Sequence, residues 1–263
     1  MTDKTIVLGD DGSEGADLAW QWLMLHRWPG WRVDVVTATE AFSKGVIASS
    51  DAPLKEWDPP ARRVATPHSS IGAVRHLTKT GDPRMVLDEC RDVSLLVLGA
   101  VGLGSLKTVL MGSTADWFLH QPSAPLALVR CAAPTETVIF CVDGSPHAQR
   151  AVEVAAALPW INTVRAQLLT VDDGRADNEV ALRAAMDTLR SVGVDAETIR
   201  ERGRPTYVIM EALAGGQDPP PLVVLGTRGL TTLRRLWLGS TAAAIARHHT
   251  GNVIVASEGA ASA

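Results

Sequence analysis

A long glycine pattern occurs twice in this chain and constrains its fold more than any other feature. Residues 99–114 read GAVGLGSLKTVLMGST, and residues 226–241 read GTRGLTTLRRLWLGST. In both stretches, two residues separate the first glycine from the second one of the pattern, nine residues separate the second from the third, and Ser-Thr follows. A chain that repeats such a pattern 127 residues later is expected to contain two copies of one structural unit.

Other short motifs recur in the same order. Residues 11–13 and residues 143–145 both read DGS, and the GDP of residues 81–83 corresponds to the GRP of residues 203–205. The spacing between corresponding motifs drifts by a few residues while their order is kept. This is the pattern expected of two related domains that differ by small insertions and deletions.

The length of the chain agrees with this division. The 263 residues suit two domains of about 130 residues each. Hydrophobic residues make up 46% of the chain and charged residues 21%, so each domain has the material for a packed core. We predict one domain over residues 1–132 and a second over residues 133–263.

Short apolar runs alternate with segments of helical periodicity in each half. The expected strands are TIVLG, RVDVVTA, VRHLTKT, SLLVLG and PLALVR in the first half, and TVIFCVD, AQLLTVD, ETIRE, LVVLG and NVIVA in the second. Helices are expected over residues 17–26, 83–90 and 113–120 (capped by Ser113), over 148–158 and 178–191, from Pro205, and after Ser240. Strands that alternate with helices predict an α/β fold: two tandem open five-stranded parallel sheets with helices on both faces.

Composition excludes several classes of partner. The net charge of −4 does not indicate nucleic acid or an anionic membrane surface. The longest apolar runs are too short to span a bilayer, and the N-terminus lacks the apolar region of a signal peptide. Three scattered cysteines form no metal-binding or CxxC spacing. We therefore expect a cytoplasmic protein with no nucleic-acid or membrane partner.

Residues at strand ends give the first indication of a binding site. In an open α/β sheet, ligands bind beyond the carboxyl ends of the strands, where the strand order reverses. Asp11 follows the first expected strand and Gly99 ends the fourth, so both face one crevice if those strands are neighbours. Asp143 and Gly226 occupy the same places in the second half, and this alignment selects Asp11 rather than Asp10.

The glycine pattern suits a nucleotide. Glycines let a ligand approach the backbone because they have no Cβ atom. The third glycine and the Ser-Thr pair stand at an expected helix start, where free N–H groups and the helix dipole attract phosphate. The aspartate carboxylates can accept hydrogen bonds from ribose hydroxyls or an adenine amino group. The pattern consists of Gly99, Gly102, Gly112, Ser113 and Thr114 in the first half, and of Gly226, Gly229, Gly239, Ser240 and Thr241 in the second.

Other interpretations of these residues stay open. The aspartates can instead cap the following helix, and the glycines can be loop residues of a repeat that has lost its ligand. Lys107, Arg228, Arg234 and Arg235 can meet phosphates or point into solvent. Two standard nucleotide motifs do not occur: Ser105 stands where a Walker A motif needs lysine, and no GxGxxG follows the first strand.

The combination of motifs resembles the universal stress protein family in its tandem two-domain form. ATP-binding members of that family carry G-x2-G-x9-G followed by Ser or Thr late in the domain, and an aspartate, typically within VDGS, at the end of the first strand. This chain has both features twice and in register. The resemblance implies a Rossmann-like fold of the adenine nucleotide alpha hydrolase type, with ATP, alone or with Mg²⁺, bound in each crevice.

The resemblance also assigns individual residues. It implies that Gly9 and Cys141, two residues before each aspartate, line the site. It implies further that Ala38 and Val171, at the ends of the second strands, lie against adenine.

The function implied is that of a nucleotide-dependent regulator of stress response or growth arrest, acting through a regulatory protein partner. The alternative is an enzyme on the same fold, either a slow ATP hydrolase or an adenylyl-transfer enzyme. An enzyme needs a base, and usually a carboxylate for Mg²⁺, beside the phosphates. The glycine patterns contain basic and hydroxyl residues but no acidic ones, and Asp116 of the first half is replaced by Ala243 in the second. Binding without fast turnover is therefore favoured.

The last strand of each half, PLALVR and NVIVA, is short and apolar. In the topology of the family, the fifth strand lies at a sheet edge. An exposed edge invites pairing with another strand, and the linker holds the two edges at high effective concentration. We therefore expect the halves to pair through these strands, which leaves outer surfaces available for a homodimer of whole chains.

Two further features receive only general interpretations. The proline-rich segment 39–70 is either a lid or partner site, or a surface loop. The eight tryptophans are expected in core packing rather than as stacking platforms for a ligand.

Overall fold

The computed structural model describes residues 4–39, 63, 71–90, 93–101, 111–172, 178–228 and 238–256. Most of the proline-rich segment and the central part of each glycine pattern lie outside these described residues. The predictions for Gly102, Lys107, Gly229, Arg234 and Arg235 therefore fall outside them as well.

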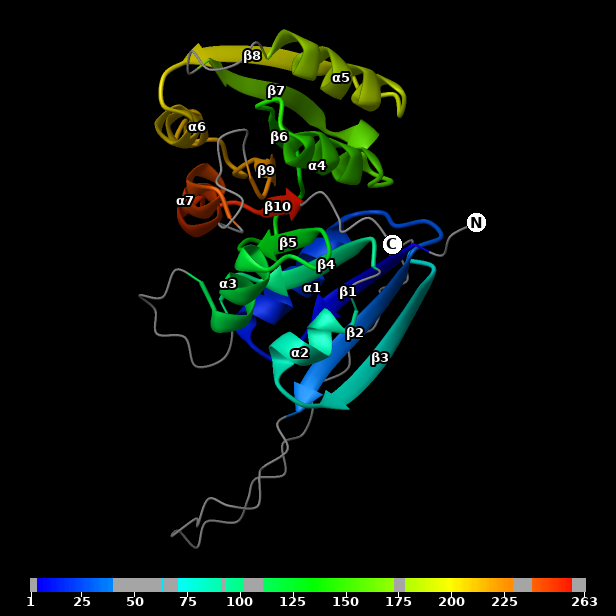
Figure 1. Cartoon of the computed structure of the whole chain (residues 1–263). Coiled ribbons are helices and arrows are strands. Elements are labelled where there is room, and N and C mark those ends of the chain that lie inside the picture. Colours follow the sequence, from blue (N-terminus) through cyan, green and yellow to red (C-terminus); the bar gives the residue numbers. More distant parts are fainter. Residues whose placement is uncertain are drawn as a thin grey trace, which may run out of the picture.

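Both halves have the predicted alternation of strands and helices (Figure 1). The first half consists of β1 (Thr5–Gly9), α1 (Glu14–Leu25), β2 (Arg32–Thr39), β3 (Ala73–Thr80), α2 (Pro83–Asp88), β4 (Leu95–Gly99), α3 (Ser113–His120) and β5 (Leu126–Val129). The second half consists of β6 (Thr137–Cys141), α4 (Pro146–Ala156), a 3-10 turn η1 (Ile161–Thr163), β7 (Arg165–Asp172), α5 (Glu179–Arg190), β8 (Ala196–Arg202), α6 (Pro205–Leu213), β9 (Leu222–Gly226), α7 (Ser240–His248) and β10 (Val253–Ala256).

The serine of each DGS motif sets the start of the following helix. The Oγ atom of Ser13 accepts a hydrogen bond from the backbone N–H of Ala16 at 3.2 Å. The Oγ atom of Ser145 accepts one from Ala148 at 3.1 Å. Because serine is a strong N-cap residue, α1 begins at Glu14. The periodicity of apolar residues predicts a later start, at residue 17. Ser113, by contrast, is not the cap of α3, because Gly112 occupies that position.

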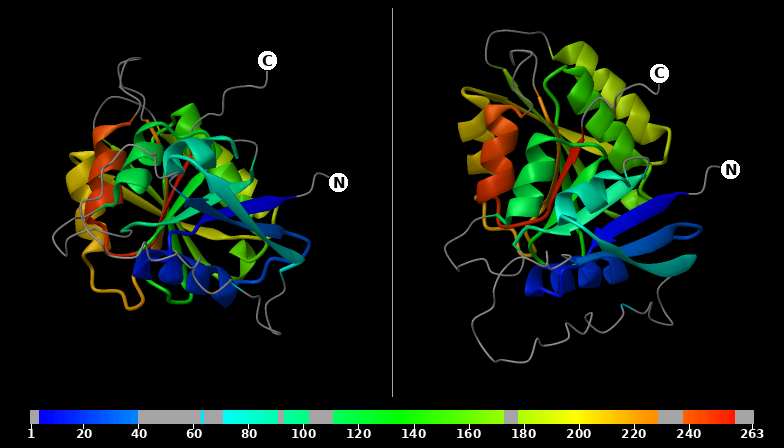
Figure 2. Two further views of the ribbon diagram at one scale, coloured as in Figure 1. Left: turned by 90° about the horizontal axis from the view of Figure 1, so that it is seen from below. Right: turned by 60° about the horizontal axis from the view of Figure 1, so that its bottom comes forward.

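All the strands of the described residues lie in one sheet, in the order β3-β2-β1-β4-β5-β10-β9-β6-β7-β8. Within each half the pairing is parallel, and the strand order reverses between β1 and β4 and between β6 and β9. Figure 2 shows helices on both faces of this sheet. The two predicted five-stranded parallel sheets are thus present, and they are joined edge to edge.

The joint is an antiparallel pairing of β5 with β10, in which Leu128 is opposite Val253. This is the pairing of last strands that the sequence predicted. Asn252 reinforces it: its Oδ1 atom accepts hydrogen bonds from the N–H of Arg130 at 2.8 Å and of Cys131 at 3.1 Å. Its Nδ2 atom donates to the carbonyl oxygen of Cys131 at 3.0 Å. One buried amide therefore satisfies three backbone groups where β5 ends.

Replacing Asn252 with alanine should weaken the joint. The two N–H groups and the carbonyl that it binds would lose their partners, and unsatisfied buried groups are costly. We expect the free energy of unfolding, measured in urea, to fall by about 2–3 kcal/mol. Gln217→Ala, which removes an exposed amide, is the matched control and should change it by less than about 0.5 kcal/mol. Equal stability of the two variants would contradict this role of Asn252.

An aromatic cluster joins the halves on the face covered by α1 and α4. The ring centroid of Trp22 lies 6.1 Å from that of Trp160 in the second half, and the ring centroid of Trp28 lies 5.9 Å from it. Both pairs are arranged edge to face. Trp22, Trp28 and Trp160 are all buried, which agrees with the predicted core role of the tryptophans. The geometry is the one that aromatic pairs prefer, so the contacts stabilise the junction beyond the area they bury.

His26 completes this cluster and is only 7% exposed. Its ring lies 4.2 Å from the ring of Trp160. Its Nδ1 atom donates to the carbonyl oxygen of Trp22 at 2.8 Å, and its Nε2 atom accepts from the N–H of Thr135 at 3.4 Å. The neutral ring satisfies both partners, whereas the protonated ring could no longer accept from Thr135. Burial lowers the pKa of His26, although the hydrogen bond to Trp22 acts in the opposite direction.

This histidine should make stability depend on pH. In the unfolded chain histidine titrates near 6.5, and burial also lowers the pKa of His249. A buried neutral histidine contributes fully above the unfolded pKa, and its contribution is lost as the pH falls toward the folded pKa. The free energy of unfolding should therefore decrease from about pH 7 to about pH 5, by up to about 1.4 kcal/mol per pH unit for each group.

The variants His26→Gln and His249→Gln test this prediction, with unfolding measured in urea across the same pH range. Each should reduce the dependence of the free energy of unfolding on pH, and the double variant should reduce it further. If both single variants keep the wild-type dependence on pH, the loss of stability in acid comes from other titratable groups.

Candidate functional site

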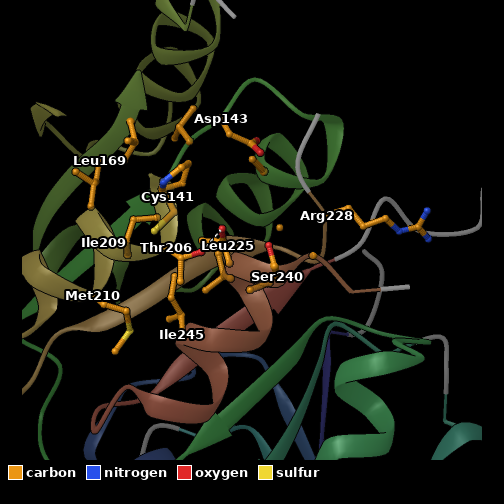
Figure 3. Close-up of a pocket in the computed structure, with 18 of the residues that line it drawn as sticks. Cys141, Asp143, Leu169, Thr206, Ile209, Met210, Leu225, Arg228, Ser240 and Ile245 are labelled. Carbon is orange, nitrogen blue, oxygen red and sulfur yellow. Dashed lines mark hydrogen bonds between the residues drawn. The ribbon is translucent and has the colours of Figure 1, made fainter. Parts of the chain in front are cut away.

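A cavity of about 710 Å³ opens in the second half at the carboxyl ends of β6, β7 and β9 (Figure 3). It lies where the strand order reverses between β6 and β9, which is where open α/β sheets bind ligands. Helices α6 and α7 form its outer wall. The lining includes seven residues predicted from the sequence: Cys141, Asp143, Val171, Gly226, Gly239, Ser240 and Thr241.

The cavity has an apolar part and a polar part. Figure 3 shows apolar side chains from strands and helices facing one another across it. The larger apolar side chains come from Cys141, Leu169, Val171, Ile209, Met210, Leu225 and Ile245. Polar and charged side chains in the lining are those of Asp143, Asn178, Arg204, Thr206, Thr227, Arg228, Ser240 and Thr241. An apolar cavity with a few convergent polar groups is the usual form of a small-molecule site.

The start of α7 supplies the polar part. Gly239 is the N-cap residue of α7, and within the described part of the chain no side chain caps this helix. Its first N–H groups therefore lack partners within the helix and face an anion favourably. The Thr241 hydroxyl lies 2.9 Å from the Thr206 hydroxyl of α6, so the starts of the two helices are joined at the cavity.

Asp143 stabilises the turn below the cavity. Its Oδ1 atom accepts a hydrogen bond from the N–H of Ser145 at 3.0 Å, and Asp11 accepts one from Ser13 at the same distance. The serines, not the aspartates, bind the first turns of α1 and α4. The alternative that the aspartates are the helix caps is therefore wrong. Asp143 lines the cavity, and a carboxylate there can accept hydrogen bonds from a hydroxyl-rich ligand.

Glycine is required at positions 226 and 99 for a packing reason that the sequence did not indicate. A Cβ atom on Gly226 would lie 2.6 Å from the backbone nitrogen of Ala148 in α4. A Cβ atom on Gly99 would lie 2.3 Å from the carbonyl carbon of Gly15 in α1. The glycines thus allow the start of a helix to pack directly on a strand end, whereas the sequence indicated close approach of a ligand. Gly226 also lines the cavity.

Gly226→Ala should therefore displace α4 from β9. We expect the free energy of unfolding to fall by about 1–3 kcal/mol, as for other overpacked positions. Gly215→Ala is the control, because a Cβ atom there would meet only the carbonyl oxygen of Ala212 at 3.4 Å. Thermal or urea unfolding measures both. A Gly226→Ala protein as stable as the control would show that the backbone shifts at little cost.

The first half has the same framework but differs at the position that corresponds to Cys141. A Cβ atom on Gly9 would lie 2.5 Å from Leu98 and 3.1 Å from Leu87, so leucine side chains fill the space beside it. Cys141 stands at this place in the second half. Burial, and to a smaller extent the charge of Asp143, raises the pKa of the Cys141 thiol to about 12. That thiol stays protonated and is not a nucleophile.

The remaining first-half predictions lie at corresponding positions. Ala38, at the end of β2, packs against the apolar cluster under α2 and α3. The N–H of Gly112 donates to the Ala100 carbonyl at 2.7 Å, and that of Gly239 donates to the Thr227 carbonyl at 2.7 Å. Ser113 and Thr114 open α3 as Ser240 and Thr241 open α7. The starts of α3 and α7 are therefore built alike.

Asp10 has a different role from Asp11. It is 5% exposed and pairs with the guanidinium of Arg63 at 3.0 Å, and Arg63 also binds Asp17 of α1. The Nε2 atom of His76 lies 2.7 Å from the carbonyl oxygen of Arg63. Asp10 is thus engaged with α1. Sequence reasoning missed this ion pair because no local pattern connects positions 10 and 63.

Sequence reasoning also missed the residues that α6 contributes to the cavity. They are Arg204, Pro205, Thr206, Tyr207, Ile209 and Met210. The signal that could have pointed to them is the correspondence of the GDP and GRP motifs, which marks this turn as common to both halves. Arg228 lines the cavity, but its side chain extends away from the other labelled residues in Figure 3.

A family model described as universal stress protein family matches residues 3–130 and again residues 134–257. The chain belongs to this family. A universal stress protein of Mycolicibacterium smegmatis is 26% identical, over 97% of this chain and 97% of that protein. One of Thermus aquaticus is 32% identical, over 40% of this chain and 86% of that protein.

The fold agrees with that of a solved universal stress protein from Archaeoglobus fulgidus. That structure has a TM-score of 0.72 at 19% identity and covers 98% of this chain and 100% of its own. The matched segments correspond to the two halves of the sheet. The domain boundaries at residues 132 and 133 and the roles of the individual site residues stay predictions.

Two features are absent from the part of the chain that the structure describes. Among these residues, no helix has the length and apolar character needed to cross a membrane. Nor do the described histidine, cysteine, aspartate and glutamate residues form a group of three or more that could hold a metal ion.

Proposed function

We propose that this universal stress protein binds ATP, one molecule in each half, and acts as a nucleotide-dependent regulator of stress response or growth arrest. The observation that supports it most is the cavity of about 710 Å³ in the second half. Its apolar part suits a base and its polar part, at the start of α7, suits phosphates.

In this proposal the base lies among the apolar side chains, next to Val171 at the end of β7. The ribose lies near Asp143, whose carboxylate accepts from its hydroxyls. The phosphates lie against Gly239, Ser240 and Thr241. In the first half the corresponding residues are Gly9, Asp11 and Ala38 at the strand ends, with Gly99 and Gly102, and Gly112, Ser113 and Thr114 at the start of α3.

The small number of acidic residues among the described residues of the site favours a regulator over the alternative enzyme. Among the described residues that line the cavity, Asp143 is the only carboxylate, and it lies at the strand end rather than in the first turn of α7. Asp116, in the first turn of α3, is paired with Arg247 of α7 at 3.0 Å. Phosphoryl transfer needs a base and a metal-binding carboxylate beside the phosphates, so we propose slow or no turnover, with Mg²⁺ held by the nucleotide.

We place this activity in the cytoplasm, since Cys90, Cys131 and Cys141 are free thiols of the kind that a reducing compartment maintains. A homodimer of whole chains and a regulatory protein partner stay predictions.

The variants Ser113→Asp and Ser240→Asp test binding in each half separately. Aspartate at the first position of a helix is favourable for the helix, but its charge repels phosphate. Calorimetry should show the stoichiometry falling from about two ATP per chain to about one in each single variant, and to none in the double variant. Unchanged stoichiometry in the two single variants and the double variant would contradict the proposal. Steady hydrolysis at about 10 per second that is lost in these variants would instead support the enzyme.

A further inference from the structure

Tyr207 is an exposed aromatic residue that also lines the cavity. It is 68% exposed, and it is the one aromatic side chain among the described residues of the lining. Single exposed apolar residues are common and need no explanation. An aromatic ring at the opening of a cavity that fits a nucleotide is different, because a planar base is a natural partner for it.

The position of Tyr207 is fixed by its neighbours on α6. Thr206 is hydrogen-bonded to Thr241 of α7 at 2.9 Å, which fixes the first turn of α6 against the start of α7. Met210, three residues after Tyr207, lies on the same face of the helix and lines the apolar part. Tyr207 therefore lies on α6 between the contact of Thr206 with α7 and Met210 of the apolar part, and its exposure leaves its ring room to rotate.

The first half has no aromatic residue at the equivalent position. Pro83 and Pro205 occupy the same place in α2 and α6, so that Met85 corresponds to Tyr207. Met85 is 60% exposed. The two halves thus share a large exposed side chain at this place, but only the second offers an aromatic face.

We propose that Tyr207 stacks on the base of the nucleotide bound in the second half and makes this site selective for purine nucleotides. The inference rests on the proposed nucleotide site and adds a specificity-determining residue to it. A purine offers a larger surface to the ring than a pyrimidine does, so stacking favours the purine. Stacking on an aromatic side chain changes affinity by roughly fivefold to a hundredfold.

Calorimetry on the Ser113→Asp protein, in which only the second site should titrate, tests this inference. Tyr207→Ala should weaken ATP binding by about tenfold, and CTP binding by less. Tyr207→Phe keeps the ring and should bind ATP as the parent does. Met85→Ala, the equivalent change in the first half, should also leave ATP binding unchanged. Because Tyr207 is exposed, all these variants should keep the melting temperature of the parent.

A second measurement reports on the ring directly. Tyr207 is the only tyrosine of the chain, so labelling with ¹³C-tyrosine gives the ring signals of one residue. ATP should shift these signals through the ring current of the base, whereas inorganic triphosphate, which has no base, should leave them in place.

The outcomes separate this inference from the proposed function. If the wild-type protein binds no ATP, the proposed function is wrong, and this inference falls with it. If ATP binds but Tyr207→Ala retains full affinity and the tyrosine signals do not move, the nucleotide site stands and the stacking role is wrong. A loss of affinity in Tyr207→Phe equal to that in Tyr207→Ala would also contradict stacking, since the ring is still present.

Discussion

The antiparallel pairing of β5 with β10 is the interaction on which the rest of the molecule depends. It joins two five-stranded units into one sheet, with Leu128 opposite Val253 at the centre of the molecule. Without it, each half would present a short apolar edge of the kind that pairs non-specifically. The pairing also brings α3 and α7 together, as the ion pair between Asp116 and Arg247 shows. On the opposite face it brings Trp22 and His26 against Trp160.

The strand order within each half determines where the sheet opens into a crevice. The cavity of the second half lies at such a strand reversal, and in each half a helix starts directly against a strand end. Gly226 makes this approach possible in the second half, because no side chain fits between it and the start of α4. Helix α7 then presents its uncapped first turn to the cavity, and its hydroxyl contact with α6 closes the outer wall. The framework of the site is therefore a product of backbone packing, and the side chains provide its chemical character.

The two halves share this framework but differ in the turn that begins α2 or α6. In the first half Asp82 caps α2 through the N–H of Arg84 at 2.9 Å, and its hydrogen bonds from Arg84 lower its pKa to about 2. In the second half Arg204 stands in the place of Asp82 and lines the cavity. At the start of this helix, an anion in one half is thus replaced by a cation in the other. Two copies of one unit thus keep the same backbone framework while differing in charge and in the exposed side chain of this turn.

The sequence by itself determined the order of strands and helices, the duplication, the strand ends that carry Asp143 and Gly226, and the pairing of the last strands. These features follow from local signals: periodicity of apolar residues, the spacing of glycines, and the apolar character of a terminal strand. Only the tertiary structure decided that Gly226 faces the start of α4, that Arg63 binds Asp10, that His26 lies against Trp160, and that Tyr207 stands at the rim of the cavity. Each of these depends on the direction of a side chain across a gap between elements far apart in the chain. No local pattern encodes such a direction, because it is set by how the helices pack on the sheet.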